Sequence, residues 1–258
     1  MPTFNLLRLR REGATKGRLG PNQSLFPPNQ SLLQMVSMTT ILRAVLFDLD
    51  GTLIHSLPDL VSAVNRLLAT EGRSALDSES VKAMVGDGAD ALVRRAFEAT
   101  GGLPGPDVAP FLDRFLADYE PRSAETTRPW PGVLETLAEL RRRGLALAVC
   151  TNKPRAATVE ILNTLGLMAF FDLVVASDDA PAIKPDPAHV QVILDRLGIS
   201  ADAAVMVGDS INDILSARRA GVRSIALSFG YAHGPVEELG ADLIVHRFDE
   251  LLAALNLI

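Results

Sequence analysis

The chain has 258 residues and a formal net charge of −6, and its single cysteine cannot form an internal disulfide bond. The acidic balance argues against nucleic acid as a partner, because contacts to phosphates need clustered lysine and arginine. No apolar run approaches the roughly 20 residues that span a bilayer, so we expect no association with a membrane. Together with the lone thiol, these features predict a protein of the reducing cytoplasm.

Residues 1–40 differ in composition from the rest of the chain. They are basic, rich in proline, asparagine, glutamine and serine, and repeat the segment PNQSL at 21–25 and 28–32. This composition predicts a disordered N-terminal extension. A mis-annotated start, with the true one at Met35 or Met38, would explain it equally well. An arginine-rich transit peptide is the alternative, but the repeat and the prolines disfavour an amphipathic helix.

From Ile41 onward, apolar strand-like runs alternate with helical patterns. The strand-like runs are Ala44–Phe47, Leu145–Cys150, Leu173–Ala176, Ala204–Val207, Ser224–Leu227 and Leu243–Val245. The helical patterns between the later strands are Gly132–Arg143, Ala156–Leu165, Pro187–Leu197 and Ile211–Ala220, and glycine stops follow at Gly144, Gly166, Gly198 and Gly221. Nearly continuous apolar strands alternating with helices predict an α/β fold, a doubly wound parallel sheet with a Rossmann-type core.

Residues 58–120 interrupt this alternation, because they contain only helical patterns. These are Asp59–Thr70, Ser78–Met84, Ala89–Ala99 and Val108–Tyr119, separated by glycine-rich breakers. A wholly helical insertion after the first strand predicts a lid above the end of that strand. We therefore expect an α/β core domain of residues 41–56 and 126–258 and an inserted helical cap domain of residues 57–125.

Polar residues follow several of the predicted strands. They are Asp48 and Asp50 after the first strand, Thr151 to Lys153, Ser177 to Asp179 with Lys184 soon after, and Gly208 to Ser210 with Asp213. In open parallel sheets, ligands bind outside the carboxyl ends of the strands, so these groups should meet at one edge. Clustered carboxylates repel each other unless a cation neutralises them. Oxygen ligands beside a lysine predict Mg²⁺ together with a phosphate.

Simpler interpretations exist for each segment. Asp-Gly and Gly-Asp dipeptides are common in ordinary turns. The segment from Asp48 also resembles the start of a calcium-binding loop, but Leu53 and Asp59 stand where that loop needs glycine and glutamate. Lys184 could be a chance lysine in an arginine-rich chain, or a compact charge that contacts phosphate.

The order of these segments resembles the four-motif signature of the haloacid dehalogenase superfamily over about residues 41–250. The matching segments are Asp48-Leu49-Asp50-Gly51-Thr52, Thr151-Asn152-Lys153, Lys184-Pro185 and Gly208-Asp209-Ser210-Ile211-Asn212-Asp213. The resemblance implies that Asp48 is a nucleophile that forms an aspartyl-phosphate. It implies that Asp50 is the general acid and then the general base, which favours phosphate chemistry over dehalogenation.

The same resemblance implies the remaining site residues. Mg²⁺ would be bound by the carboxylate of Asp48, the main-chain carbonyl of Asp50 and Asp209, with Asp213 in or near its shell. The implied substrate-binding residues are Thr151, Asn152, Lys184, Gly51 and Gly88. Thr151 and Lys184 are counted with the catalytic residues as well, because they would stabilise the charge of the phosphoryl group.

Segments around the insertion resemble bacterial phosphoglycolate phosphatases. They are Ser56-Leu57-Pro58-Asp59-Leu60, Val85-Gly86-Asp87-Gly88-Ala89 and Pro129-Trp130-Pro131-Gly132-Val133. This resemblance implies hydrolysis of 2-phosphoglycolate to glycolate and phosphate. The turn Gly86-Asp87-Gly88, alone or together with Arg94 or Arg95, could receive the substrate carboxylate, since a helix N-terminus binds anions. Equally, it could be a plain turn between helices beside a solvated arginine face.

Other functions remain open at this point. They are a phosphatase for a sugar phosphate or pyrophosphate, a phosphomutase and a non-catalytic interaction protein. The full set of motif residues disfavours the last. We expect a small-molecule phosphate as the partner, and a monomer or homodimer. We also expect His55 to pack beneath the cap in preference to binding substrate, and Trp130 to anchor the returning linker.

Overall fold

A six-stranded parallel sheet forms the centre of the computed structural model, which describes residues 41–258. The prediction for residues 1–40 therefore lies outside the described residues. The strand order is β5-β4-β1-β6-β7-β8, and every neighbouring pair is parallel. The strands are β1 (Ala44–Phe47), β4 (Ala146–Cys150), β5 (Leu173–Val175), β6 (Ala204–Gly208), β7 (Arg223–Leu227) and β8 (Leu243–Val245).

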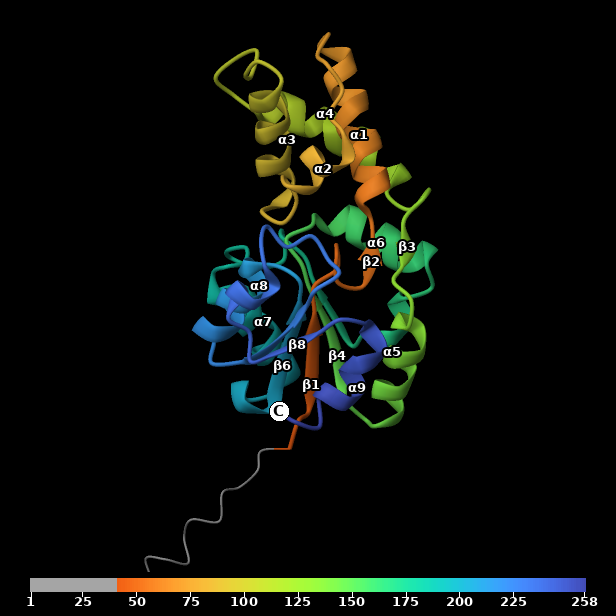
Figure 1. The fold of residues 1–258 in the computed structure, drawn as a ribbon, viewed down its shortest axis with the longest axis vertical. Helices are drawn as coiled ribbons and strands as arrows, with labels where there is room; N and C mark the ends of the chain where they lie inside the picture. The colour runs from red at the N-terminus through yellow and green to blue at the C-terminus, as the bar shows by residue number, and fades with distance from the viewer. Residues whose placement is uncertain (1–40) are drawn as a thin grey trace, which may run out of the picture. The chain divides into compact units, whose positions relative to one another are not determined.

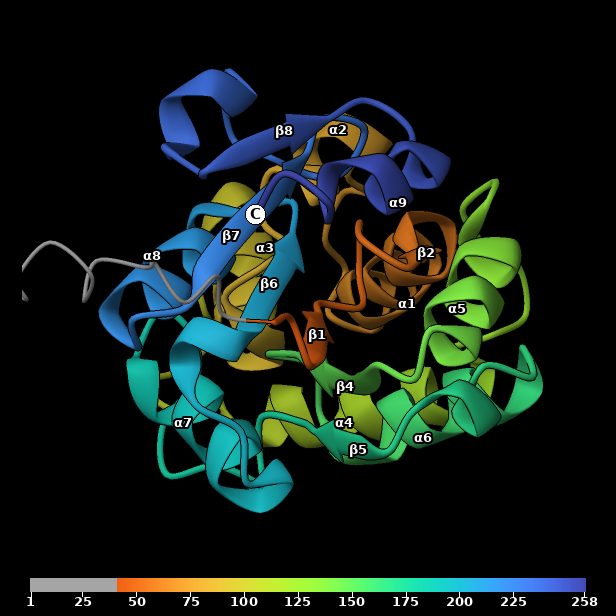
Figure 2. The same cartoon turned by 90° about the horizontal axis from the view of Figure 1, so that it is seen from below.

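Helices cover both faces of the sheet, as Figure 2 shows from below. One face carries α5 (Val133–Arg142), α6 (Arg155–Thr164) and α9 (Leu251–Ala254), and the other carries α7 (Pro187–Leu197) and α8 (Ile211–Arg219). Side chains of the fully buried strand β1 alternate between the two layers, with Val45 and Phe47 in one core cluster and Ala44 and Leu46 in the other. This alternation explains why β1 is apolar at every position.

The predicted doubly wound α/β core is thus confirmed, with strand limits that differ by at most one residue at either end. The four predicted glycine stops all have positive φ, between 62° and 78°, which ends the helices before them. Short 3₁₀ helices occupy several of the connections: Met168–Phe170 (η3), Ala201–Ala203 (η4), Val236–Leu239 (η5) and Phe248–Glu250 (η6). No helix within residues 41–258 is long and apolar enough to cross a membrane.

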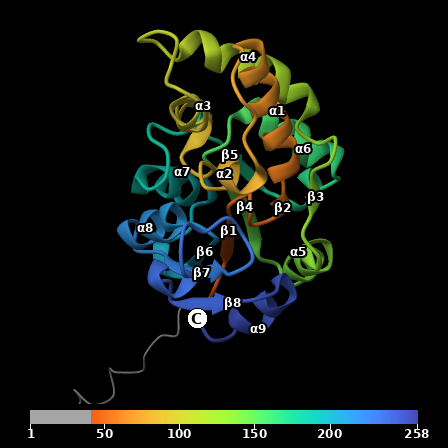
Figure 3. The same ribbon diagram turned by 45° about the horizontal axis from the view of Figure 1, so that its top comes forward.

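The inserted helices lie above the carboxyl ends of the strands (Figures 1 and 3). They are α1 (Leu57–Thr70), α2 (Ser78–Lys82), α3 (Gly88–Ala99), α4 (Ala109–Tyr119) and the 3₁₀ helix η2 (Glu120–Arg122). Their apolar faces form a hydrophobic cluster of their own, which also includes Ala157 and Tyr231 from the sheet side. The boundaries of the two proposed domains stay a prediction.

Two short strands that sequence periodicity did not reveal join the helical insertion to the sheet. β2 (Ile54–His55) pairs antiparallel with β3 (Arg128–Pro129). Next to them, the buried carboxylate of Asp59 accepts hydrogen bonds from the main chain and the hydroxyl groups of Thr126 and Thr127, with distances of 2.8 Å and 2.7 Å from Thr127 N and Oγ1. Asp59 therefore ties the outgoing linker to the returning one.

Replacing Asp59 with asparagine should lower the free energy of unfolding by about 1–3 kcal/mol, because an amide nitrogen would face groups that donate. Burial raises the pKa of Asp59, but the hydrogen bonds from Thr126 and Thr127 lower it more, to below the ordinary value of 3.8. The contribution of this carboxylate to the free energy of unfolding is therefore fully present above pH 3.8, and it is lost as the pH falls through the lowered pKa.

Urea denaturation of the wild type and Asp59→Asn at several pH values measures this contribution. The difference should be largest near neutral pH and should shrink in acid. Asp113→Asn is the matched control, since Asp113 is exposed on α4. Equal stability of Asp59→Asn and the wild type at neutral pH would contradict the assigned role.

Candidate active site

The loop after β1 presents the two aspartates of the first motif. Asp48 N donates to Val207 O of the neighbouring strand at 3.0 Å, and the buried Leu49 and Leu53 anchor the following turn. Gly51 has φ +83°, and a Cβ there would lie 2.3 Å from Asp209 Oδ2. This position therefore needs glycine for its conformation and for space. Gly51, expected to bind substrate, lies against Asp209.

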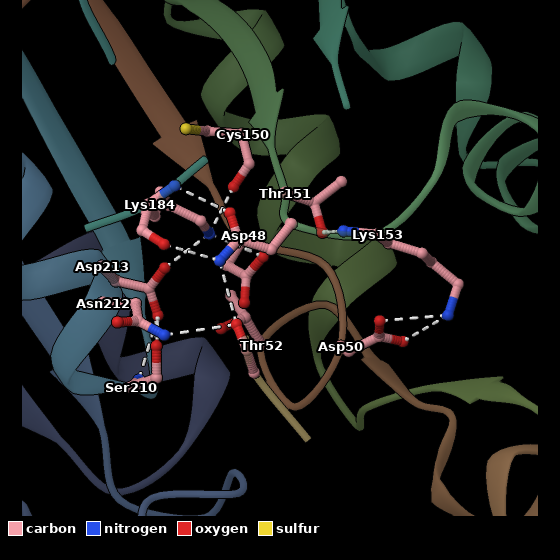
Figure 4. Close-up of polar contacts among 12 residues, drawn as sticks. Asp48, Asp50, Thr52, Cys150, Thr151, Lys153, Lys184, Ser210, Asn212 and Asp213 are labelled. Carbon is pink, nitrogen blue, oxygen red and sulfur yellow. Dashed lines mark hydrogen bonds and ion pairs between the residues drawn. The ribbon is translucent and has the colours of Figure 1, made fainter. Parts of the chain in front are cut away.

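Lys184 is the buried cation beside Asp48. Its Nζ lies 2.9 Å from Asp48 Oδ1, 2.6 Å from Asp213 Oδ1 and 2.6 Å from the carbonyl oxygen of Cys150 (Figure 4). Three acceptors thus match the three N–H groups of the ammonium. Burial lowers the pKa of Lys184, but Asp213 and Asp48 raise it above its ordinary value. The side chain therefore stays charged under the nucleophile candidate.

Asp213 reaches this cluster through a helix cap. Ser210 is the N-cap of α8, and the pair Ser210 and Asp213 forms a capping box in which Asp213 Oδ2 accepts from Ser210 N at 3.0 Å. Its other oxygen, Oδ1, accepts from Lys184. A Cβ at Gly208 would lie 2.3 Å from Asp213 Cγ, so this glycine makes room for the carboxylate. The same local motif therefore starts a helix and holds the lysine.

Asp209 is held from both sides. Thr52 Oγ1 donates to its Oδ1 at 2.7 Å, and Tyr231 N donates to its Oδ2 at 2.6 Å. Oxygens of Asp209, Asp48 and Asp213 lie within 4.8 Å of one another. Such a set of hard oxygen donors fits Mg²⁺. The side chain of Asp50 lies outside this set, so its expected contribution to the metal would come from its main-chain carbonyl.

The pKa values of this cluster reflect the cost of crowding carboxylates. Burial, together with the charges of Asp213 and Asp50, raises the pKa of Asp48 to about 6, although Lys184 opposes the shift. Burial and the charges of Asp48 and Asp213 also raise the pKa of Asp209 well above its ordinary value. Like charges in a low-dielectric site disfavour ionisation, and a bound cation would reverse this effect.

The Asp50 side chain points away from the metal cluster toward Lys153. Lys153 Nζ lies 3.2 Å and 3.1 Å from the two Asp50 oxygens and donates to Tyr119 Oη at 2.6 Å. Burial raises the pKa of Tyr119 to about 12, so its hydroxyl stays protonated at neutral pH. Because Tyr119 belongs to α4, this contact links the acid candidate to the inserted helices.

Thr151 and Asn152 follow β4 as expected, but the Asn152 side chain has a structural role. Its Oδ1 accepts from Lys184 N at 2.8 Å, and its Nδ2 donates to Lys184 O at 2.9 Å and to Gly86 O at 3.0 Å. It therefore holds the lysine loop and the insertion together. Thr151 is 1 % exposed, and its Oγ1 accepts from Lys153 N at 3.2 Å.

A cavity of about 50 Å³ lies between the strand ends and the inserted helices. Its polar wall includes Asp48, Asp50, Thr151, Asn152 and Lys153. The fold thus brings these groups together at one edge of the sheet, as the sequence predicted. The opposite wall is apolar, with Leu60, Val85, Leu92, Phe115 and Leu116. Gly88 also lines this cavity, whereas Lys184 lies beneath Asp48 and does not.

The turn Gly86-Asp87-Gly88 lies against the sheet side. Asn212 Nδ2 donates to Asp87 Oδ1 at 2.6 Å, and Arg95 Nη2 donates to Asp87 Oδ2 at 2.5 Å. Arg94 forms an exposed ion pair with Asp90, which lies one turn before it in α3. Neither arginine lines the cavity, whereas Gly86 and Gly88 of the turn do. The carboxylate site expected at the turn therefore stays a prediction, and the positions of Arg94 and Arg95 do not support a contribution from either.

His55 at the end of β2 and Trp130 directly after β3 pack against each other where these strands join the inserted helices to the sheet. Their rings are 4.8 Å apart, and neither lines the cavity beside Asp48. His55 Nδ1 lies 3.0 Å from Tyr231 Oη, which also accepts from the main-chain N–H groups of Ser56 and Leu57 at 2.9 Å and 3.0 Å. Tyr231 therefore connects the start of α1 with Asp209.

Sequence reasoning did not assign a function to Lys153, Tyr119 or Tyr231. A signal for the lysine was present, because it is a second scarce lysine in an arginine-rich chain and directly follows two motif residues. The chain contains only two tyrosines, and both contact site residues. No local pattern distinguishes them, since their contacts join residues distant in the sequence.

Comparison with known proteins shows the family to which the chain belongs. Residues 45–227 match the family of haloacid dehalogenase-like hydrolases. A phosphoglycolate phosphatase of Caulobacter vibrioides is 46 % identical over 205 residues, which cover 79 % of this chain and 86 % of that protein. A phosphoglycolate phosphatase of Rhodospirillum rubrum is 44 % identical, covering 81 % of this chain and 89 % of that protein.

Solved structures agree in fold. A predicted phosphoglycolate phosphatase from Haemophilus somnus superposes with a TM-score of 0.79 at 32 % identity, covering 83 % of this chain and 97 % of that one. CbbY from Rhodobacter sphaeroides, solved with phosphate, gives a TM-score of 0.73 at 27 % identity and covers 84 % of this chain and all of that one. The chain therefore belongs to the haloacid dehalogenase-like hydrolases and is a phosphatase-like enzyme of that family.

Proposed function

We propose that this protein hydrolyses 2-phosphoglycolate to glycolate and phosphate through a phosphorylated Asp48. The observation that carries the proposal is the position of Asp48. It lines a small cavity, with Lys184 at 2.9 Å beneath it and Asp50 on the same wall. A carboxylate held by a buried cation next to a second carboxylate provides a nucleophile and a proton-transfer group for one ester.

In the first step, an oxygen of Asp48 attacks phosphorus and the bond to the leaving oxygen breaks. Asp50 gives its proton to that oxygen, so glycolate leaves as an alcohol. Thr151 and the main chain of Asn152 hold the phosphoryl oxygens, and Lys184 offsets the charge of Asp48.

In the second step, Asp50 takes a proton from a water molecule. The water oxygen attacks phosphorus, the bond to Asp48 breaks, and phosphate leaves with Asp48 restored. Asp50 thereby ends the cycle protonated, ready for the next ester. Each step uses the same two aspartates, as the loop after β1 keeps them one residue apart.

We further propose Mg²⁺ as the cofactor, held by Asp48, the Asp50 carbonyl and Asp209, with Asp213 in or near its shell. Four carboxylates, those of Asp48, Asp50, Asp209 and Asp213, face only two ammonium groups, those of Lys153 and Lys184. A divalent cation would balance the remaining formal charge. When bound, Mg²⁺ would screen the repulsion between the Asp48 carboxylate and the anionic phosphoryl group.

The small cavity supports a small leaving group. Its volume of about 50 Å³ is room for a few water molecules, since one needs roughly 10–15 Å³ by this measure. The relatives named phosphoglycolate phosphatase point to the same ester. We propose accordingly a small-molecule phosphate as the partner of a cytoplasmic monomer or homodimer.

A sugar phosphate is the second candidate substrate. A mutant of CbbY from Rhodobacter sphaeroides, 27 % identical to this chain, has been solved in complex with xylulose-(1,5)bisphosphate. Such a molecule is larger than 2-phosphoglycolate and would extend further from the strand ends. The same chemistry at Asp48 and Asp50 would serve either substrate.

Replacing Asp48 with asparagine should reduce kcat by roughly 10⁴-fold or more, because the nucleophile is lost. Replacing Asp50 with asparagine should also stop turnover but leave Asp48 able to attack an activated ester such as p-nitrophenyl phosphate. Mass spectrometry after rapid quenching should therefore find a phosphorylated enzyme only in Asp50→Asn. Wild-type turnover by Asp48→Asn in the presence of Mg²⁺ would refute the assigned nucleophile.

Removing divalent cations with EDTA should abolish turnover, and added Mg²⁺ should restore it. Without substrate, Mg²⁺ should raise Tm, because an ion bound only by the folded state stabilises it by about 2.7 kcal/mol at one hundred times its Kd. Asp209→Asn should weaken this rise and Asp113→Asn should retain it. Differential scanning calorimetry measures Tm with and without Mg²⁺. A Tm that does not change when Mg²⁺ is added would contradict the proposed site.

The substrate assignment is tested by measuring phosphate release from 2-phosphoglycolate, sugar phosphates, nucleotides and pyrophosphate. We expect kcat/KM for 2-phosphoglycolate to exceed the others by about tenfold or more, because one strong polar contact contributes that much. Comparable low rates for all esters would leave the chemistry at Asp48 intact and remove the glycolate assignment. A lead for a sugar phosphate would favour the second candidate.

A further inference from the structure

Lys153 is a cation whose role the two proposed steps do not explain. Its side chain is 3 % exposed, yet it lines the cavity at which Asp48 and Asp50 meet. Among the described residues that line this cavity, it is the single one with a cationic side chain. The remaining walls are apolar or carry carboxylate, hydroxyl and amide groups. An anionic part of a substrate would therefore meet one complementary charge there.

We propose that Lys153 receives the carboxylate of the substrate and selects esters that carry an anionic group one carbon away from the ester oxygen. The inference rests on the proposed function, because it assigns the specificity of the same site. It replaces the carboxylate site expected at the Gly86-Asp87-Gly88 turn with Arg94 or Arg95. Both arginines lie outside the cavity lining, whereas Lys153 is part of it.

The position of Lys153 relative to Asp50 gives the geometric reason. The leaving oxygen must come within hydrogen-bond distance of Asp50 to receive its proton. In 2-phosphoglycolate, a single methylene separates that oxygen from the carboxylate. The Lys153 ammonium, at 3.1 Å and 3.2 Å from the Asp50 oxygens, therefore lies within reach of the carboxylate. A longer linker would carry the anionic group past it.

Tyr119 fixes the ammonium in this place. Its hydroxyl accepts from Nζ at 2.6 Å, and its ring lies under the same nitrogen at 4.7 Å from ring centroid to Nζ. Two N–H groups remain for the Asp50 oxygens. A substrate carboxylate would take over one of these donors, which would leave one Asp50 oxygen to face the leaving oxygen.

The test compares 2-phosphoglycolate with 2-phosphoglycolamide, an ester of the same size in which a neutral amide replaces the carboxylate, in the Mg²⁺-loaded full-length enzyme. We expect a large kcat/KM ratio of acid to amide in the wild type. The neutral variants Lys153→Met and Lys153→Gln should lower this ratio by about tenfold or more, the value of a charged hydrogen bond. Lys153→Arg, which keeps the charge, should retain much of it.

Two matched controls separate the proposal from its competitors. Lys82→Met removes a lysine of α2 outside the cavity and should leave the ratio unchanged. Arg94→Met should do the same. If the acid-to-amide ratio of kcat/KM falls in Arg94→Met and not in the Lys153 variants, the carboxylate binds at the Gly86-Asp87-Gly88 turn and not at Lys153. Equal losses for acid and amide in the Lys153 variants would show that Lys153 acts only on Asp50.

The outcomes distinguish this inference from the proposed function. If the wild-type acid-to-amide ratio of kcat/KM is large and the Lys153 variants leave it unchanged, the inference is overturned and the assignment of 2-phosphoglycolate as the substrate is retained. A wild-type ratio near one overturns both, while phosphate release from other esters would still identify a phosphatase. A crystal structure of the wild type with 3-phosphonopropionate, a non-hydrolysable analogue, checks the same point without mutation. Its carboxylate should contact Lys153 Nζ, and a carboxylate bound elsewhere would overturn the inference.

Discussion

The ammonium of Lys184 is the contact that allows carboxylates to gather at the end of the sheet. It joins Asp48 after β1, Asp213 in α8 and the carbonyl of Cys150 in β4, so one cation serves three elements of the core. Without an internal cation, carboxylates buried this close would repel each other strongly. The pKa values of Asp48 and Asp209 are raised by burial and by neighbouring carboxylates, which agrees with the proposal of a further cation at this site.

Space for these carboxylates comes from glycine. Gly51, Gly208 and Gly230 each lie against Asp209 or Asp213, at positions where a Cβ would lie 2.3 Å or 2.4 Å from a carboxylate atom. Main-chain and hydroxyl donors from Thr52, Tyr231 and Ser210 then fix the carboxylate orientations. The glycines and donors together create a preorganised site, in which charged groups are held before any substrate arrives.

The inserted helices complete the site through a few polar contacts. Tyr119 reaches Lys153, the Gly86 carbonyl accepts from Asn152, and Asp87 accepts from Asn212. Each contact joins the insertion to a residue that follows a core strand or starts a core helix. An apolar wall faces the aspartates across the cavity, and Lys153 is the cationic residue among the described residues that line it. The proposed specificity residue Lys153 and the proposed reacting aspartates thus share one wall of a small cavity.

The sequence alone determined the parallel α/β core, the helical insertion and the four motifs, because strand period, glycine stops and motif order are local properties of the chain. It also identified the aspartates at the strand ends, since parallel strands place their carboxyl ends at one edge. Only the tertiary structure decided which side chains meet across long separations, such as Lys153 with Asp50 and Tyr119. The same holds for the placement of Arg94 outside the cavity, because the packing of α3 sets which of its faces turns to solvent.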